Sequence, residues 1–301
     1  ATESGSQSVS ITITENESAP VITMLASQAS AAENSGTEVT LTLTTSQIAD
    51  ENIVVSLSAS GTISSSDYVS TSLSPSTVTI SAGSTTGTVS ATASDDSIYE
   101  GNESSTVSIS GVSGGGATES GNQSITFTIV ENEAAPVITL TTSHTTVAEN
   151  SGTTVTLTAT ASQAADEDIT VTLASTGTAI NGTDYSSFGG QTITIAANST
   201  TGTITGTPTD DSMYEGDEVA TISISGVSGI DATESGTQSV SIAITENELA
   251  PIVTLTASAT SIAENSGSPI TFTLALEIPA GVTQTTTSED VIVQIGNSVS
   301  G

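Results

Sequence analysis

The sequence predicts an all-β protein made of antiparallel β-sandwiches in tandem. Short runs in which Val, Ile or Leu alternate with Ser or Thr follow one another along the chain, and no stretch shows a convincing helical period. Such alternation is typical of strands with one buried face and one face in water. Sequence landmarks also recur at long, regular intervals, which indicates that a whole domain is repeated.

The landmark Ala-Thr-Glu-Ser-Gly begins at residues 1, 117 and 232, so the spacing is 116 and then 115 residues. That spacing is too long for a solenoid repeat and matches a small domain with its own core. We therefore expect a linear array and read the chain as a window on a longer one. Residues 1–17 would be the last strand of a preceding repeat, 18–133 and 134–248 two complete repeats, and 249–301 the first part of a further repeat.

Seven alternating runs in the first complete repeat predict its strands. Turn signals separate these runs, and seven short strands of this kind predict an antiparallel sandwich. The runs are Val21–Ala26, Val39–Leu43, Ile53–Leu57, Val78–Ile80, Val89–Ala93, Val107–Ile109 and Ile125–Ile129.

The charge of the chain excludes several classes of partner. It carries 33 acidic residues and no Lys or Arg, for a formal net charge of −33. Nucleic acids and anionic membrane surfaces need basic patches, so we expect neither as a partner. No run approaches the roughly 18 apolar residues of a membrane span, so we expect no membrane insertion in this segment. The acids can be balanced only by metal ions, backbone N–H groups, solvent ions or partner molecules.

The densest candidate site is the acidic stretch Asp95–Glu103, which recurs as Asp210–Glu218. Successive loops of an antiparallel sandwich alternate between its two ends. The loops after the first, third and fifth strands and the exit of the seventh should therefore lie at one end. We expect these acids to converge there: Glu33, Asp67, Asp95, Asp96, Glu100, Glu103, Glu131 and Glu133 in the first repeat, and Glu149, Asp184, Asp210, Asp211, Glu215, Glu218, Glu246 and Glu248 in the second.

Converging carboxylates of this number favour calcium as the ligand. Ca²⁺ takes about six to eight oxygen ligands in flexible geometry, so one such cluster has room for more than one ion, whereas Mg²⁺ demands stricter octahedral geometry. Zinc and copper favour His or Cys, and the chain has one His and no Cys. The alternative is an acidic surface that is merely solvated, as in a salt-adapted protein.

A second set of acids falls in the loop after the second predicted strand, and therefore at the opposite end of the sandwich. One hypothesis is that this loop approaches the calcium cluster of the preceding domain, and the other is a plain polar loop. The acids are Asp50, Glu51, Asp166, Glu167, Asp168, Glu289 and Asp290.

Together these motifs resemble the Calx-β domain family. The residues that carry the resemblance are Ala-Glu-Asn-Ser-Gly at 32 and 148, Gly-Thr followed by Asp67-Tyr68 or Asp184-Tyr185, the two Asp-Asp-Ser-x-Tyr-Glu stretches, and the closing Glu-Asn-Glu at 131 and 246. The resemblance implies immunoglobulin-like β-sandwiches that bind calcium at the loops of one end, with the acids already named as ligands. The best calcium binders of the family close the last strand with a run of Asp, whereas this chain has Glu-Asn-Glu, whose longer side chains change the geometry.

The resemblance implies a non-catalytic, extracellular or cell-surface protein, because the family occurs in tandem in large adhesion and matrix proteins. We expect calcium at the domain ends to rigidify a rod, stalk or filament of a biofilm or surface matrix. The partners would then be calcium ions, neighbouring repeats and, in a filament, identical chains. The alternative is a calcium-sensing regulatory module of a larger membrane or surface protein. Catalysis is not expected, because His144 has no nucleophile at a telling spacing and the chain has no Trp to line a sugar cleft.

Overall fold

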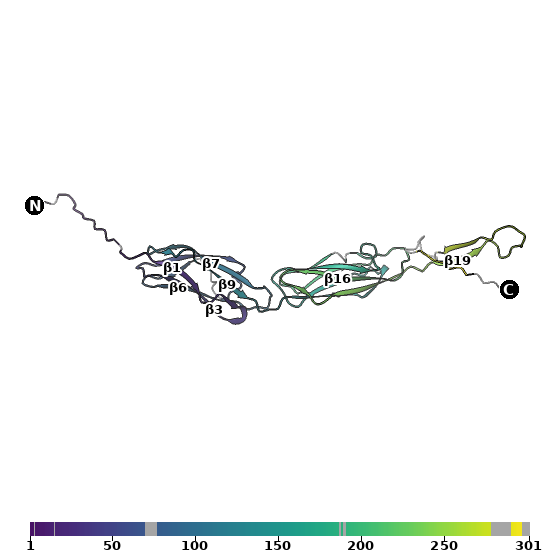
Figure 1. Cartoon of the computed structure of the whole chain (residues 1–301), viewed down its shortest axis with the longest axis horizontal. Coiled ribbons are helices and arrows are strands. Elements are labelled where there is room, and N and C mark those ends of the chain that lie inside the picture. The colour runs from purple at the N-terminus through teal and green to yellow at the C-terminus, as the bar shows by residue number, and fades with distance from the viewer. Residues whose placement is uncertain are drawn as a thin grey trace. The chain divides into compact units, whose positions relative to one another are not determined.

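The computed structural model describes residues 1–2, 4–14, 16–69, 77–186, 188, 191–277 and 290–296. The chain forms two compact units: Ala1–Asp96 with Gly101–Glu133, and Ser97–Glu100 with Ala134–Gly301. Each unit contains a β-sandwich, and no α-helix occurs among the described residues (Figure 1). The predicted acid Glu289 lies outside the described residues.

The first sandwich confirms the predicted fold class and contains a strand at each of the seven predicted positions. Two short strands, β2 and β8, were not predicted. The elements are β1 (Val21–Ala26), β2 (Ser30–Ala32), a 3₁₀ turn η1 (Glu33–Ser35), β3 (Glu38–Thr45), β4 (Ile53–Gly61), β5 (Thr77–Ile80), β6 (Thr86–Thr92), β7 (Glu103–Ser113), β8 (Thr118–Glu119) and β9 (Ser124–Val130).

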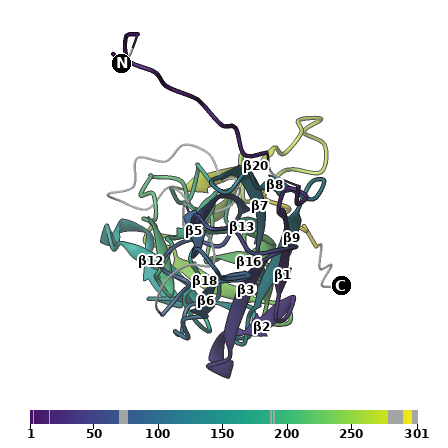
Figure 2. The same ribbon diagram turned by 90° about the vertical axis from the view of Figure 1, so that its left-hand side faces the viewer.

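Two sheets make up this sandwich. One has the order β6-β3-β1-β8 and the other the order β2-β9-β7-β4-β5; Figure 2 labels β6, β3 and β1 in this sequence. The chain changes sheet after the first predicted strand, because β1 pairs antiparallel with β3 whereas the next strand, β2, pairs parallel with β9. That change of sheet sends the chain after β2 to the end of the sandwich where β9 finishes.

The second sandwich repeats this architecture. Its sheets have the orders β15-β12-β10-β17 and β11-β18-β16-β13-β14. The elements are β10 (Val137–Thr142), β11 (Thr146–Ala148), the 3₁₀ turn η2 (Glu149–Ser151), β12 (Val155–Ala161), β13 (Ile169–Gly177), β14 (Thr192–Ile195), β15 (Thr201–Gly206), β16 (Glu218–Ser228), β17 (Thr233–Glu234) and β18 (Ser239–Thr245).

The core of each sandwich lies between its two sheets and consists of the alternate residues of the strands. Strand β12 shows the pattern clearly, because Val155, Leu157, Ala159 and Ala161 are buried while the Thr residues between them are partly exposed. Burying apolar surface in this way contributes about 25 cal/mol per Å². The Ser and Thr residues make the outer faces of the sheets polar, and therefore well solvated, without adding charge.

The second unit continues into a hairpin of β19 (Ile252–Ala257) and β20 (Phe272–Glu277), which pair antiparallel. Their side chains are largely exposed, unlike those of the two sandwiches. Within the part of the chain that the structure describes, no helix is long and apolar enough to cross a membrane.

Candidate metal centres

Strand register brings together two acids that are far apart in the sequence. Strands β11 and β18 are parallel neighbours, with Ala148 opposite Thr245. The next residue on each strand is an acid, Glu149 on one and Glu246 on the other, so both leave the same edge of the sheet. The first sandwich repeats the arrangement, because Ala32 lies opposite Val130 and is followed by Glu33.

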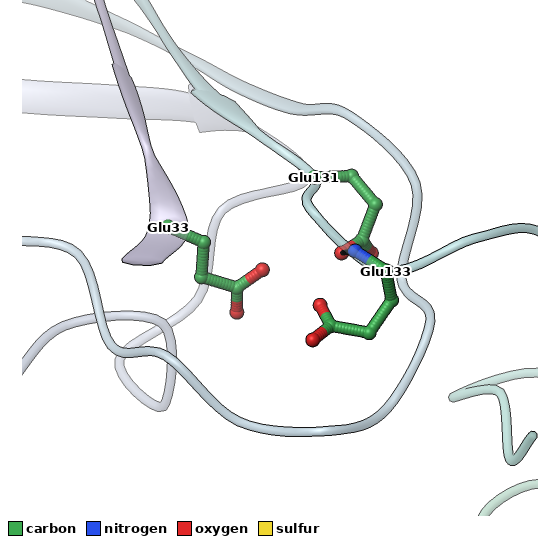
Figure 3. Close-up of side chains that lie close together, drawn as sticks. All are labelled: Glu33, Glu131 and Glu133. Carbon is green, nitrogen blue, oxygen red and sulfur yellow. Dashed lines mark hydrogen bonds between the residues drawn. The ribbon is translucent and has the colours of Figure 1, made fainter. Parts of the chain in front are cut away.

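The first acidic group in each sandwich is built on this edge. In the second sandwich, one carboxylate oxygen from each of Glu149, Glu246 and Glu248 lies within 4.8 Å of the others. The same holds for Glu33, Glu131 and Glu133, whose carboxylates point toward one another in Figure 3. Glu33 is only 4% exposed and Glu149 only 8%, and burial this deep is rare for an acid in a chain that has no Lys or Arg.

The second acidic group joins the loop before β14 to the acidic stretch before β16. Oxygens of Asp184, Glu215 and Glu218 lie within 4.8 Å of one another, and Asp67, Glu100 and Glu103 meet the same criterion. The backbone N–H of Ile180 donates to Asp184 Oδ2 at 2.6 Å, and Asp184 is 7% exposed. The aspartate is therefore fixed by its own loop before any ion is considered.

Glu246 holds two loops together. Its Oε2 accepts the backbone N–H groups of Glu215 at 2.6 Å and Gly216 at 2.9 Å. Its Oε1 accepts those of Asn247 at 2.9 Å and Glu248 at 3.0 Å. Such charge-assisted bonds favour the ionised carboxylate. Although burial acts in the opposite direction, the hydrogen bonds from Glu248 and from these backbone groups lower the pKa of Glu246 to about 2.

The neighbouring carboxyls show the opposite shift. Burial, with Asp184 close by, raises the pKa of Glu218 to about 7. Burial also raises the pKa of Glu149 to about 7, and the charge of Glu246 adds to the effect. Hydrogen bonding to Glu246 and burial raise the pKa of Glu248 to about 7. Proximity of like charges in a chain without Lys or Arg is therefore costly unless a proton or a metal ion joins the group.

Two buried carboxylate oxygens also show that these groups are not fully satisfied by hydrogen bonds. Glu133 Oε2 and Glu248 Oε2 are buried, and no N–H or hydroxyl group donates to either of them. A buried acceptor without a donor costs about 1–3 kcal/mol. These oxygens belong to the equivalent groups of the two sandwiches, so both sandwiches place an unsatisfied acceptor at the same point.

The geometry fits calcium. Protein oxygens lie about 2.3–2.6 Å from Ca²⁺, so two ligands on opposite sides of one ion are at most about 5 Å apart. Each group of three carboxylates is within that span, and loop carbonyls and waters would complete the shell. With the shorter Mg²⁺–O distance of about 2.1 Å the span is about 4.2 Å, which the groups need not satisfy.

Twelve of the sixteen acids predicted to converge form these groups, two groups in each sandwich. Members of the four groups are Glu33, Asp67, Glu100, Glu103, Glu131, Glu133, Glu149, Asp184, Glu215, Glu218, Glu246 and Glu248. Asp95, Asp96, Asp210 and Asp211 lie outside these groups. Asp211 nevertheless contacts one of them, because its backbone N–H donates to Glu149 Oε1 at 3.2 Å. As ligands, all sixteen acids stay a prediction.

Sequence reasoning missed one repeat position that shapes the site, occupied by Asp217 in the second sandwich and Asn102 in the first. Asp217 Oδ1 accepts the backbone N–H of Glu246 at 3.0 Å. Asn102 Oδ1 does the same for Glu131 at 3.0 Å. Since both Asp and Asn provide this acceptor, the position is structural, and the Asp/Asn difference between the repeats was the signal that charge is not needed there.

Comparison with known families gives two matches. The model of the LapA domain matches residues 20–132. The model of the Calx-beta domain matches residues 131–249. Residues 131–249 are therefore similar to the Calx-β family. The Calx-β repeat and the LapA match together fit an extracellular adhesion and calcium-binding repeat, and both are non-catalytic domain types. No curated protein matches the chain.

Solved structures that are similar to the chain include three of interest. CBD12 from CALX1.2 has 16% identity over 74% of this chain and 99% of that one, with a TM-score of 0.32. The apo-form Calx CBD1 domain has 20% identity over 37% of this chain and 98% of that one, with a TM-score of 0.31. The adhesin InvE of Yersinia pseudotuberculosis has 15% identity over 79% of this chain and 65% of that one, with a TM-score of 0.33. Scores this low carry no argument about function.

Proposed function

We propose that this chain is a structural or adhesion repeat of an extracellular rod, stalk or filament, and that Ca²⁺ binds the two acidic groups of each Calx-β-type sandwich. One observation carries the proposal: each group gathers three carboxylate oxygens within 4.8 Å in a chain that has no Lys or Arg. Only a proton or a metal ion neutralises such a group from within, and carboxyls whose pKa lies near 7 are only partly protonated at neutral pH.

The proposed mechanism is a cation-dependent connection between loops. At the first group of the second sandwich, an ion would join the turn at Glu149 to the strand exit at Glu246 and Glu248. At the second group, an ion would join the loop of Asp184 to the acidic stretch of Glu215 and Glu218. The chain leaves the sandwich through 246–251, where Pro251 limits bending. Calcium would thus stiffen the path to the next repeat.

Isothermal titration calorimetry with calcium tests the binding. We compare the chain with Asp184→Asn and with the matched control Glu167→Gln, which removes one charge from an exposed acid of the same unit. We expect Asp184→Asn to lose about one ion or at least about tenfold in affinity, equivalent to 1.4 kcal/mol. Equal titrations for all three proteins would overturn the assignment.

Small-angle scattering with and without a chelator tests the structural role. A rod, stalk or filament unit should lengthen and lose flexibility when calcium is added. Calcium binding without any change in scattering would instead favour the regulatory module, whose response would lie in a part of the protein beyond these repeats.

A further inference from the structure

The loop between β13 and β14 holds the aspartate of the second acidic group with its own backbone. The N–H of Ile180 donates to Asp184 Oδ2 at 2.6 Å, and the N–H of Asp184 donates to the Ile180 carbonyl at 3.0 Å. The next residue, Tyr185, is only 2% exposed. The turn from Ile180 to Asp184 is therefore closed by two hydrogen bonds and anchored in the core at its C-terminal end.

The middle of this turn is Asn181-Gly182, the one Asn-Gly pair of the sequence, and both residues are exposed. Gly182 has φ +89°, and a Cβ there would meet nothing within 4 Å, so the turn has free space around it. The first sandwich closes the equivalent turn with a bond from the Ser64 N–H to Asp67 Oδ2. That turn is one residue shorter and contains no Asn, so the Asn-Gly pair is not needed to hold the aspartate.

An exposed Asn followed by Gly is the dipeptide that converts most readily to isoaspartate. The backbone nitrogen of the following residue attacks the Asn side-chain carbonyl carbon, and glycine hinders this approach least because it has no Cβ. A C–N bond forms, the amide nitrogen leaves as ammonia, and a five-membered succinimide remains. Water then opens the ring at one of its two carbonyls and gives aspartate or isoaspartate. The reaction consumes only water and changes no oxidation state.

One hydrogen bond of the folded loop opposes this reaction. The Gly182 N–H, which has to lose its proton, donates to the Tyr185 carbonyl at 2.8 Å. The nitrogen is released when the turn opens, and opening also breaks the bonds between Ile180 and Asp184. An ion at the group of Asp184 would bind the closed turn in preference to the open one and would therefore oppose the opening.

We propose that Asn181 is a modification site at which spontaneous conversion to isoaspartate weakens the ion-binding group of Asp184, and that calcium protects the site from this conversion. Isoaspartate routes the backbone through the side chain, so it adds one carbon atom to the closed turn. It also adds a carboxylate close to Asp184. The chain would thus lose one ion-binding group at a rate set by the time it spends without calcium.

The conversion itself needs no calcium site, whereas its effect on ion binding and the protection rest on the proposed function. Asn198 provides an internal control for the conversion. It is exposed, is followed by Ser instead of Gly, and lies in the turn between β14 and β15 of the same sandwich. Its following N–H is also hydrogen-bonded, because the Ser199 N–H donates to the Ala196 carbonyl at 3.0 Å.

Incubation of the full chain at mildly alkaline pH, in calcium or in a chelator, tests the proposal. Peptic peptide mapping and enzymatic methylation of isoaspartate measure the conversion, since the chain has no Lys or Arg for trypsin to cleave at. In the chelator we expect isoaspartate to form at Asn181 at least about tenfold faster than at Asn198, equivalent to about 1.4 kcal/mol in the barrier. Calcium should slow the conversion at Asn181 by about tenfold or more.

Calcium calorimetry of the incubated chain measures the effect on binding. We expect the modified chain to lose about one ion or about tenfold in affinity. Asn181→Gln, whose longer side chain would have to form a less favourable six-membered ring, should bind as before after the same incubation. Binding that the modification leaves unchanged overturns the proposal, and so does isoaspartate that forms no faster at Asn181 than at Asn198.

The fresh chain separates this proposal from the proposed function. Equal conversion rates with and without calcium, in a chain that binds calcium when fresh, contradict the protection. A fresh chain that binds no calcium contradicts the proposed function and the protection together. Even then, the ratio of conversion at Asn181 to that at Asn198 in the chelator decides whether Asn181 is a modification site.

Discussion

At the residue scale, the carboxylates of the candidate site have different roles. Glu246 accepts four backbone N–H groups and is held ionised, whereas Glu149, Glu218 and Glu248 have raised pKa values. One acid therefore positions the loops, and its neighbours carry the charge that a cation would neutralise. The environment of each carboxylate, rather than its residue type, makes this difference.

We predict that Glu246→Gln destabilises the second sandwich by about 2 kcal/mol, because an amide nitrogen replaces one acceptor and faces two backbone N–H donors. Chemical denaturation in a chelator measures this loss without any contribution from calcium. The control Glu167→Gln, at an exposed acid, should change stability by less than about 0.5 kcal/mol. Equal losses for the two variants would contradict the role given to Glu246.

We predict that the metal-free chain loses stability as the pH rises from about 4.5 to about 7. Glu149, Glu218 and Glu248 have folded pKa values of about 7, above their ordinary value of 4.5. The folded state then binds protons more tightly than the unfolded state, so their contribution is present below pH 4.5 and lost through pH 7. Thermal melts in a chelator measure the slope.

Glu246 and calcium should each change that pH profile. Glu246 acts in the opposite direction, because its pKa of about 2 lies below 4.5, so its contribution is lost as the pH falls from about 4.5 to about 2. Calcium should flatten the decline toward pH 7 by stabilising the ionised carboxylates. A metal-free melting temperature that rises between pH 4.5 and 7 would contradict the raised pKa values.

At the element scale, a close contact between two strands positions one of the acidic groups. Gly177 ends β13 with φ +121°, and a Cβ there would lie 2.0 Å from the carbonyl oxygen of Val219 on β16. Val219 follows Glu218, the first residue of β16. The glycine thus allows β16 to begin close to the loop that carries Asp184. Gly61 makes the same approach to Ser104 in the first sandwich.

We predict that Gly177→Ala costs about 3 kcal/mol and weakens calcium binding at the group of Asp184, since the new methyl group forces β13 and β16 apart. Chemical denaturation and terbium luminescence measure the two effects. Gly226→Ala is the matched control, because a Cβ at Gly226 on the partner strand β16 would meet nothing within 4 Å. Unchanged terbium binding in Gly177→Ala would show that this contact does not position the group.

At the scale of the whole molecule, the charge of −33 dominates. Repulsion between charges of the same sign destabilises the compact folded state. The acidic groups concentrate that repulsion at one end of each sandwich. Salt screens the diffuse part, while a bound cation removes the local part. These two contributions can be separated by experiment because only the second depends on the identity of the ion.

We predict that calcium at about 100 times its dissociation constant stabilises the chain by about 2.7 kcal/mol per site, which raises the melting temperature by about 10 °C for a domain of this size. Differential scanning calorimetry measures the shift. The control is NaCl at equal ionic strength, which should give a smaller rise. Equal shifts in the two salts would mean that charge screening alone explains the effect.

Much of the fold was predictable because it depends on local patterns. Strands such as β12 alternate between buried Val, Leu or Ala and wetted Thr, and that alternation is visible in the sequence. The short strand β2 was missed because three residues are too few to show a period. It takes its place only by pairing with β9.

The convergence of the acids was predictable for a different reason. Successive antiparallel strands alternate in direction, so the order of the loops alone assigns Glu149 and Glu246 to the same end. The division into two groups per sandwich was not predictable, nor was the placement of Asp95 and Asp210 outside them. Those outcomes depend on the parallel register of β11 with β18 and on the approach of Gly177 to Val219.

The sequence by itself determined the all-β class, the repeat, the absence of any Lys or Arg partner and the set of acids from which the candidate metal centres are built. Only the tertiary structure decided which three oxygens meet in each group and which carboxylate is held by backbone N–H groups. The physical reason is range: alternation and charge are properties of neighbouring residues, whereas the approach of Glu149 and Glu246 oxygens to within 4.8 Å of each other is fixed by strand register and packing across the sandwich.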